Sequence, residues 1–318
     1  MKILQITPHL PPPFEGVGTY ATALAGALAR RGIETRFLVP DRTVRGLSRE
    51  IGDAETVLLH YAGYGYQRRG CPAWLAEGLA SWRGRLVTVF HEAWASGPPW
   101  RSSFWLLPLQ RRIAAALARR SSALATTLQI YADMLRPWAP DIAVMPVFST
   151  VGEPERVPAF GERERRLVVF GGAGVRGRAY GPFRAELARA ARELEAVEIV
   201  DVGSPLDLPA AVGGVPVRAL GVLPAFGVGE VLLGSAAGFL AYPPDFLPKS
   251  TIFAAYCAHG LLPVCAWGRH PGSGPPYWTG AGDPGSIAAG ARAWYSGHRL
   301  EIQAERFRDL LVAGSRGA

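Results

Sequence analysis

Residue types that bind anions stand at two places in this sequence. The first is Lys2–Tyr20 (KILQITPHLPPPFEGVGTY), where Gly16 and Gly18 begin an apolar repeat with helical spacing. Neither glycine has a Cβ, so a phosphate or a backbone can approach closely, and a helix start presents unpaired N–H groups to an anion. The alternative is a glycine turn that only starts the helix. The spacing differs from G-x-G-x-x-G, so it does not indicate a nicotinamide dinucleotide.

The second place is Lys249-Ser250-Thr251, which follows Pro248 at an expected helix start. One ammonium, two hydroxyls and the helix N–H groups suit a phosphate. A positive charge about 4 Å from an anion near a protein surface contributes roughly 4 kcal/mol before desolvation, and the helix end adds about 0.3 to 1 kcal/mol. The structural alternative is a Ser/Thr cap beside a solvated lysine.

A tyrosine-rich loop, YAGYGYQRRGCP, follows an expected strand over residues 56–60 and carries residue types that bind sugars. Tyr64 and Tyr66 offer aromatic faces on which the C–H face of a sugar ring can stack, and Arg68 offers donors for hydroxyl groups. We therefore name these three residues as candidates for acceptor binding. The alternative is a loop packed on its own domain.

His91 and Glu92 follow directly after the expected strand over residues 86–90. In a parallel sheet, residues just past a strand end lie on the side where ligands bind. A single histidine is more often a hydrogen-bonded structural residue, so this position alone leaves both readings open. We name Glu92 as a further candidate for acceptor binding. Trp94 comes next and fits either one wall of an acceptor site or a simple apolar contact.

The elements that must position these residues alternate between apolar runs and helical repeats. Strands are expected over residues 3–6, 35–39, 56–60, 86–90, 122–126 and 142–147. After a polar segment broken by Pro154 and Pro158, the alternation restarts with a strand over 167–170, a glycine loop (GGAGVRGRAYG) and a helix over 183–194. This order predicts an α/β protein with two Rossmann-like domains, residues 1–150 and 166–318, joined by a linker over 151–165.

Composition sets further bounds on the function. The chain has 318 residues, which is enough for two such domains, and a formal charge of +8 that comes almost wholly from arginine. This charge would attract phosphorylated sugars, anionic lipid headgroups or nucleic acid, and it does not choose between them. Three cysteines without metal-ligand spacing argue against a disulfide framework or a zinc site. With no signal sequence or apolar span visible, we expect a cytoplasmic protein.

The strand opening at Lys2, the Pro-rich loop and G-V-G-T-Y over residues 16–20 resemble the N-terminus of retaining GT-B glycosyltransferases (glycosyltransferase family 4-like, glycogen-phosphorylase-like superfamily). The resemblance implies two Rossmann-like domains facing a central cleft, with a nucleotide-diphosphate sugar as donor and no further cofactor. It also implies that Gly16 and Gly18 lie near the donor and that His91 lies beside the donor sugar. Arg176 and Arg178 of the glycine loop would hold the diphosphate, and the last helix often crosses back to the first domain.

One feature of the resembled family is missing. Its two glutamates, separated by seven residues, fall on Leu247 and Ala255, and neither side chain can accept a hydrogen bond from the ribose hydroxyls. No D-x-D pair marks a Mg²⁺ or Mn²⁺ site either, so we expect a metal-independent reaction.

Three functions stay open from the sequence. The first is a retaining glycosyltransferase acting on a sugar, lipid-linked or small-molecule acceptor, without nucleic acid but with room for a peripheral membrane contact. The second is a non-catalytic GT-B pseudoenzyme that binds a nucleotide, a glycan or a partner enzyme. The third is a sugar-nucleotide epimerase, which would need carboxylates at the reacting carbon that the sequence does not reveal. The oligomeric state is undetermined.

Overall fold

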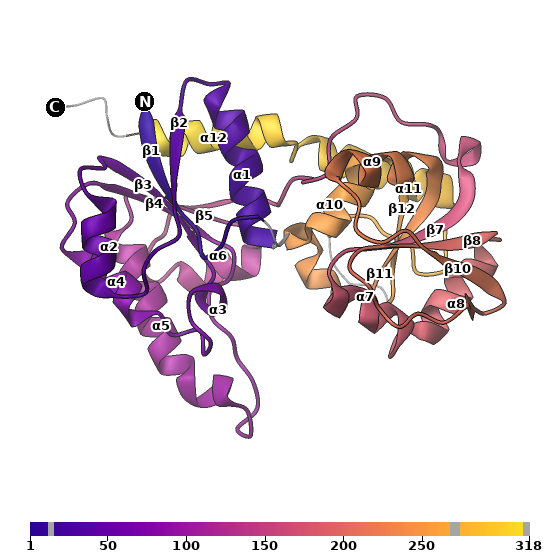
Figure 1. Ribbon diagram of the computed structural model, residues 1–318, viewed down its shortest axis with the longest axis horizontal. Helices are drawn as coiled ribbons and strands as arrows, with labels where there is room; N and C mark the ends of the chain where they lie inside the picture. Colours follow the sequence, from indigo (N-terminus) through magenta and orange to yellow (C-terminus); the bar gives the residue numbers. More distant parts are fainter. Residues whose placement is uncertain (12–15, 268–273, 314–318) are drawn as a thin grey trace. The chain divides into compact units, whose positions relative to one another are not determined.

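The computed structural model describes residues 1–11, 16–267 and 274–313. The chain forms two compact units (Figure 1). Unit 1 comprises Met1–Pro146 together with Leu300–Ala318, and unit 2 comprises Val147–Arg299. Each unit contains one six-stranded sheet with helices packed on it. The predicted α/β class with two Rossmann-like domains is therefore confirmed.

The sheet of unit 1 is fully parallel, with the order β2-β1-β3-β4-β5-β6. Its strands are β1 (Lys2–Ile6), β2 (Glu34–Leu38), β3 (Thr56–Tyr61), β4 (Arg85–Phe90), β5 (Ala123–Thr126) and β6 (Ile142–Val144). The central strands are buried on both faces, which is why they read as continuous apolar runs. From β1 the chain goes first to β2 on one side and then to β3 on the other. The topological switch point, where ligands bind in such sheets, therefore lies at the carboxyl ends of β1 and β3.

Seven helices of the described residues belong to unit 1. They are α1 (Gly16–Ala29), α2 (Val44–Ile51), α3 (Gly63–Tyr66), α4 (Ala73–Ala80), α5 (Ser102–Arg120), α6 (Gln129–Leu135) and α12 (Leu300–Val312). Helix α1 packs against α12, while α2, α4 and α5 pack in series on the opposite face of the sheet (Figure 1). None of the helices in the part of the chain that is described has the length and apolar character that a membrane span needs.

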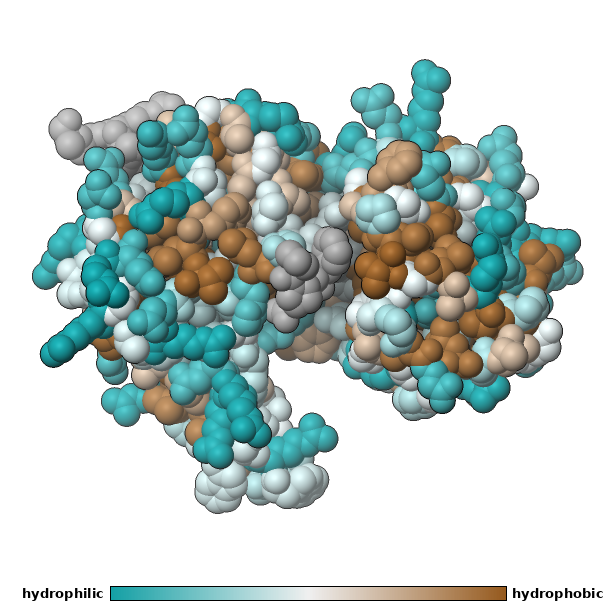
Figure 2. All heavy atoms as spheres, viewed as in Figure 1, coloured by the Kyte–Doolittle hydropathy of each residue, from teal (hydrophilic) through white to brown (hydrophobic). Residues whose placement is uncertain are grey.

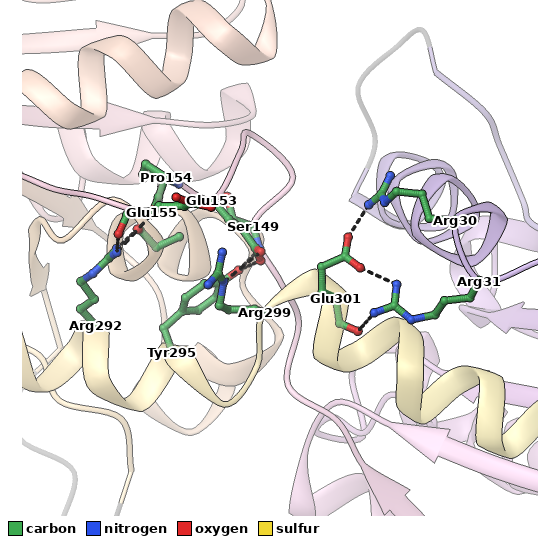
Figure 3. Close-up of polar contacts among 11 residues, drawn as sticks. Arg30, Arg31, Ser149, Glu153, Pro154, Glu155, Arg292, Tyr295, Arg299 and Glu301 are labelled. Carbon is green, nitrogen blue, oxygen red and sulfur yellow. Dashed lines mark hydrogen bonds and ion pairs between the residues drawn. The ribbon is translucent and has the colours of Figure 1, made fainter.

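Helix α12 is attached to unit 1 by buried and polar contacts along its length. Its Glu301 accepts hydrogen bonds from Arg30 and Arg31, just beyond the end of α1 (Figure 3). The buried Gln303 donates to the carbonyl of Pro146 at 3.0 Å, and Phe307 and Leu311 lie in the core. Unit 1 is thus built from two separate stretches of the chain.

The sheet of unit 2 has the order β12-β11-β7-β8-β10-β9, and only β9 runs antiparallel to its neighbour. Its strands are β7 (Glu164–Phe170), β8 (Glu198–Val202), β9 (Ala211–Val212), β10 (Val215–Ala219), β11 (Ser235–Leu240) and β12 (Leu262–Cys265). Its helical elements are η1 (Phe160–Glu162), α7 (Ala173–Tyr180), α8 (Arg184–Glu193), α9 (Ala225–Gly234), η2 (Pro244–Lys249), α10 (Thr251–Ala258) and α11 (Pro284–Ser296). Here the switch point lies at the carboxyl ends of β7 and β11.

The segment predicted as a linker, residues 151–165, is packed into unit 2. Arg163 is buried, and its guanidinium donates to the carbonyls of Pro158, Leu232, Leu233, Ser235 and His259. Arg292 of α11 likewise donates to the carbonyls of Pro154 and Glu155, both at 3.1 Å (Figure 3). These bonds fix the segment, so the boundary lies between Pro146 and Val147, and the linker prediction is corrected.

Candidate functional site

A buried polar cluster lies at the switch point of unit 1 and joins three neighbouring strands. His60 at the end of β3 places Nε2 2.8 Å from Oε1 of Gln5 on β1 and Nδ1 3.1 Å from Nε2 of His91, which directly follows β4. Gln5 in turn donates from Nε2 to the Thr35 hydroxyl at 3.3 Å. Tyr20 of α1 stands edge-on to both imidazole rings, with centroid distances of 5.9 Å to His60 and 5.1 Å to His91.

The environment of His60 determines how protons are arranged in this cluster. Burial, and second the neighbouring His91, hold the pKa of His60 well below its usual value, so His60 is neutral. Because Gln5 Oε1 is an acceptor, His60 carries its proton on Nε2 and accepts from His91 at Nδ1. His91 therefore holds a proton on Nε2, and its neutral form has the lone pair on Nδ1. Only 8% of His91 is exposed.

The structure divides the residues proposed for acceptor binding. Tyr66 is buried and donates its hydroxyl to the carbonyls of Ile6 at 3.2 Å and His60 at 3.0 Å. Trp94 lies edge-on to Trp138, with Arg111 5.5 Å from its ring centroid. Tyr66 therefore serves the packing of unit 1, and its acceptor role is corrected. Trp94 is half-buried, so its acceptor role stays a prediction.

The other three candidates stay accessible to different degrees. Tyr64 is 43% exposed, although its hydroxyl accepts from Gln110 at 3.2 Å. Arg68 is exposed and Glu92 is half-buried. The side chains of these three residues are accessible to an acceptor, although the Tyr64 hydroxyl already has a hydrogen bond from Gln110.

The two glycines at the start of α1 have different surroundings. A Cβ added to Gly18 would lie 2.5 Å from the backbone oxygen of His9, so this glycine permits a close approach of the Pro-rich loop. Among the residues that the structure describes, none lies within 4 Å of a Cβ added to Gly16. Gly18 is therefore explained by packing, whereas no described residue fills the space beside Gly16, and a ligand contact there stays a prediction. Residues 12–15 of the predicted loop lie outside the described residues.

At the switch point of unit 2, the turn after β7 lies against the first turn of α10. Gly171 has φ +127°, and a Cβ there would fall 2.4 Å from Cδ1 of Ile252. The N-termini of α7 and α10 are therefore near each other, and no described residue lies within 4 Å of a Cβ added to Gly172, the N-cap of α7. Both helix starts present N–H groups, which makes this place suitable for an anion.

The Lys249-Ser250-Thr251 stretch lies at this switch point, where η2 ends and α10 begins. Ser250 is the N-cap of α10 and accepts from the N–H of Phe253 at 3.2 Å, so its hydroxyl has the capping role that the sequence left open. Thr251 is the first residue of α10. Lys249 is half-buried, with its ammonium 5.8 Å from the ring centroid of Phe246. The cap leaves Lys249 and the helix start as the groups suited to a phosphate.

The predicted glycine loop is largely a helix, and this changes the role of its arginines. Arg176 on α7 is fully buried, with Nη1 2.8 Å from Oδ1 of Asp201 and Nε 3.0 Å from the carbonyl oxygen of Gly171. Its guanidinium therefore fixes the turn after β7 and cannot hold a diphosphate, which corrects the prediction. Arg178, two residues further along α7, is half-buried, so its diphosphate role stays a prediction.

The positions of the missing glutamates are part of the core. Leu247 and Ala255 are each 1% exposed, so these two sites supply no carboxylate and no room for one. Within residues 1–11, 16–267 and 274–313, no group of three or more His, Cys, Asp and Glu side chains could hold a metal ion.

Sequence reasoning found His91 but missed its partners Gln5 and His60. A signal existed, because each is a polar residue inside an otherwise apolar strand (KILQI and TVLLHY). The sequence does not show the strand register, and it is the register that aligns Gln5, His60 and His91 in one cluster.

This fold is the GT-B glycosyltransferase-like fold, as comparison with solved structures shows. An alpha-glucosyltransferase solved in complex with UDP is similar over 98% of this chain and 95% of its own, at 12% identity and a TM-score of 0.56. An alpha-glucosyltransferase in complex with UDP-glucose and DNA is also similar, with 11% identity and a TM-score of 0.54 over 98% of this chain and 95% of that one.

Proteins of other activities share the fold as well. WaaG, a glycosyltransferase involved in lipopolysaccharide biosynthesis, is similar over 98% of this chain and 100% of its own, at 12% identity and a TM-score of 0.51. A Listeria monocytogenes protein assigned as a UDP-N-acetylglucosamine 2-epimerase matches over 98% and 88%, at 12% identity and a TM-score of 0.50. No family model matches the sequence, and no curated protein sequence is similar enough to match it.

Proposed function

We propose that this protein transfers a glycosyl group from a nucleoside-diphosphate sugar to an acceptor. The observation that carries the proposal is that the N-termini of α7 and α10 lie near each other at the switch point of unit 2, with Lys249 directly before the N-cap of α10. Fixed N–H groups and an ammonium stabilise the charge that develops on a leaving diphosphate. The UDP complexes of proteins with this fold support a nucleotide as the ligand.

The reaction we propose retains configuration and needs no metal. The acceptor oxygen bonds to the anomeric carbon as the bond from that carbon to the diphosphate breaks, and the departing phosphate takes the acceptor proton. His91 then positions the donor sugar, and the Gln5–His60 pair holds His91 in the tautomer protonated on Nε2. In this scheme Gln5 and His60 are positioning residues, while the acceptor is a sugar, a lipid-linked compound or a small molecule.

Lys249→Ala tests the donor site. Loss of a hydrogen bond to a charged group should weaken UDP binding by about 1.5 to 3 kcal/mol in calorimetry without unfolding the protein. Lys2 is a matched control because it is the only other lysine and is exposed beside Glu34. If Lys249→Ala and Lys2→Ala bind UDP as tightly as the wild type, Lys249 does not contact the nucleotide.

A binding protein without catalysis is the second candidate. The buried Leu247 and Ala255 favour it, because no carboxylate can reach a ribose from those positions. Incubation with UDP-sugars in the absence of acceptor separates the two, since a transferase releases some free sugar by transfer to water and a pure binder releases none. The fold is shared with an epimerase as well, and a changed sugar still attached to UDP would reveal that activity.

A further inference from the structure

Large apolar side chains are exposed together at the start of α5. Trp100 is 84% exposed, Trp105 71%, Leu109 43% and Phe104 40%. Their helical spacing places Trp105 and Leu109 on one face, with Phe104 at its edge. Arginines at positions 101 and 112 are exposed on the same face. We call these six residues the α5 patch: Trp100, Arg101, Phe104, Trp105, Leu109 and Arg112.

The geometry of the α5 patch suits entry into an apolar environment. Trp105 donates its indole N–H to the carbonyl of Pro99 at 2.8 Å, so its ring can leave water without an unpaired donor. Phe104 packs edge-on against Trp105, with centroids 5.3 Å apart. The first turns of α5 project from the rest of unit 1 (Figure 1), and Figure 2 shows that end as a protruding lobe. The patch is therefore convex.

The chain segment that carries the α5 patch has charged residues of one sign. Between Glu92 and Asp133 the sequence has no acidic residue, while arginines occur at positions 101, 111, 112, 119 and 120. Such a stretch attracts an anionic surface through space and can bind phosphate groups at close range. The occupant of the patch must therefore combine negative charge with an apolar interior.

Two other occupants fit these observations less well. A second copy of the chain would bring arginines against arginines across a symmetric interface, which is repulsive. Single-stranded nucleic acid could stack on the aromatic rings, but such sites are positively charged grooves, whereas this patch is convex and includes the aliphatic Leu109. An anionic bilayer matches both the charge and the shape, because tryptophan rings insert at the level of the headgroups beside bound arginines.

We infer that the α5 patch docks unit 1 onto the anionic surface of a phospholipid bilayer. Trp100, Trp105 and Leu109 enter the boundary between headgroups and acyl chains, while Arg101 and Arg112 bind lipid phosphates. Docking needs neither a nucleotide sugar nor catalysis, so it can be measured independently of the proposed transfer.

Flotation with phosphatidylcholine vesicles, with and without phosphatidylglycerol, tests the apolar contribution. The wild type should float with the anionic vesicles, and the double variant Trp100→Ser/Trp105→Ser should lose at least about tenfold in partitioning. Phe226→Ser is the matched control, because Phe226 on α9 of unit 2 is 77% exposed and lies outside the patch. Its partitioning should equal that of the wild type.

The charge contribution is tested by the double variant Arg101→Glu/Arg112→Glu. Reversal of two charges should lower partitioning by at least about tenfold at low ionic strength, and added salt should weaken binding of the wild type. Arg42→Glu/Arg156→Glu changes the net charge equally at two exposed arginines outside the patch, and it should bind nearly as the wild type does.

Three results would overturn the inference. The first is a wild-type protein that fails to float with anionic vesicles at low salt. The second is an equal loss of binding in the patch variants and their controls. The third is binding to another occupant in place of vesicles. It would appear as self-association in sedimentation, or as a complex with a single-stranded oligonucleotide, that is lost in the tryptophan variants while the wild type does not bind vesicles.

Discussion

At the scale of single residues, the two glycines that open α1 show how the surroundings of a position determine its role. The sequence presents Gly16 and Gly18 as equivalent, yet only Gly18 lies against a backbone oxygen. Neither has a positive φ, so alanine at either site is free of backbone strain. The difference between them is therefore purely one of space.

Gly18→Ala should destabilise unit 1, because its Cβ would lie 2.5 Å from the His9 oxygen and the loop would have to move. We expect a loss of about 1 to 3 kcal/mol in denaturant titration, the range typical of overpacking. Gly16→Ala should change stability by less than about 0.5 kcal/mol, as surface substitutions usually do. An equal loss of unfolding free energy in both variants would show that a side chain at position 16 meets other residues as closely as one at position 18.

Gly16→Val then probes the ligand, since a larger side chain fills the same space. We expect transfer to fall while circular dichroism and the melting temperature change little. A variant that stays fully active would exclude Gly16 from the ligand site.

His259 at the end of α10 should make the protein sensitive to acid. Burial, followed by the charges of Arg163 and Arg292, lowers its pKa from 6.5 to about 4, although its Nδ1 bonds to the carbonyl of Ala255. Between these pH values the unfolded chain binds a proton that the native state does not, so stability is complete above pH 6.5 and is lost as pH falls. The loss at pH 4 is about 3 kcal/mol.

Denaturant titrations from pH 7 to pH 4 will show this loss as a falling free energy of unfolding. His259→Gln keeps a donor without a titrating group, and its free energy should fall less over the same range. Parallel curves for the variant and the wild type would assign the acid sensitivity to other groups, of which the neutral buried His60 is the first.

At the scale of elements, one buried arginine holds together the start of unit 2. Arg163 lies just before β7 and supplies donors to the carbonyls that end α9 and α10. Burial and the nearby Arg292 lower its pKa to about 10, so it stays charged at neutral pH. Arg163 belongs to an arginine-rich run, a sequence pattern that is typical of a solvated face. Only the fold shows that the Arg163 side chain is buried.

Arg163→Met should cost at least about 3 kcal/mol in the free energy of unfolding, because several buried carbonyls lose their donor at once. Arg156→Met is the control, since Arg156 is exposed and its replacement should stay within about 0.5 kcal/mol. Thermal denaturation of the two variants side by side decides the matter. Equal melting temperatures would mean that water can replace the Arg163 guanidinium.

Much of the element order was predictable, because buried parallel strands read as apolar runs and most helices have clear repeats. Helix α7 was not, since its glycines resemble a loop and its Arg176 resembles a ligand-binding side chain rather than the partner of Asp201. Helix α2 was missed because it is polar, although Thr43 caps it by accepting from the N–H of Gly46 at 3.0 Å. The candidate sites depend on contacts between distant segments, which periodicity does not report.

At the scale of the whole molecule, the two units do not follow one another simply along the chain. Unit 2 is one continuous stretch, Val147–Arg299, whereas unit 1 needs the residues on both sides of it. The resemblance suggested that the last helix crosses back, and α12 packs on α1 and along the sheet of unit 1. The surface ion pairs of Glu301 add little to this, because exposed pairs contribute about 0 to 1 kcal/mol.

Separate expression of the units tests this division. Residues 147–299 should fold alone, and residues 1–146 should not, because Phe307 and Leu311 of α12 fill buried places in unit 1. A short Gly/Ser connection from Pro146 to Leu300 should restore folding, since Gln303 lies 3.0 Å from the Pro146 carbonyl. Cooperative melting of residues 1–146 without α12 would contradict this view.

Helix α12 also has a consequence for synthesis on the ribosome. Since translation proceeds from the N-terminus, residues 1–146 emerge first but must wait until the whole of unit 2 has been made before α12 reaches them. Unit 2 can close as soon as its own residues have left the exit tunnel. The half of the protein that is made first is therefore completed last, and the apolar face of α1 that α12 covers stays exposed, or is held by a chaperone, for most of that time.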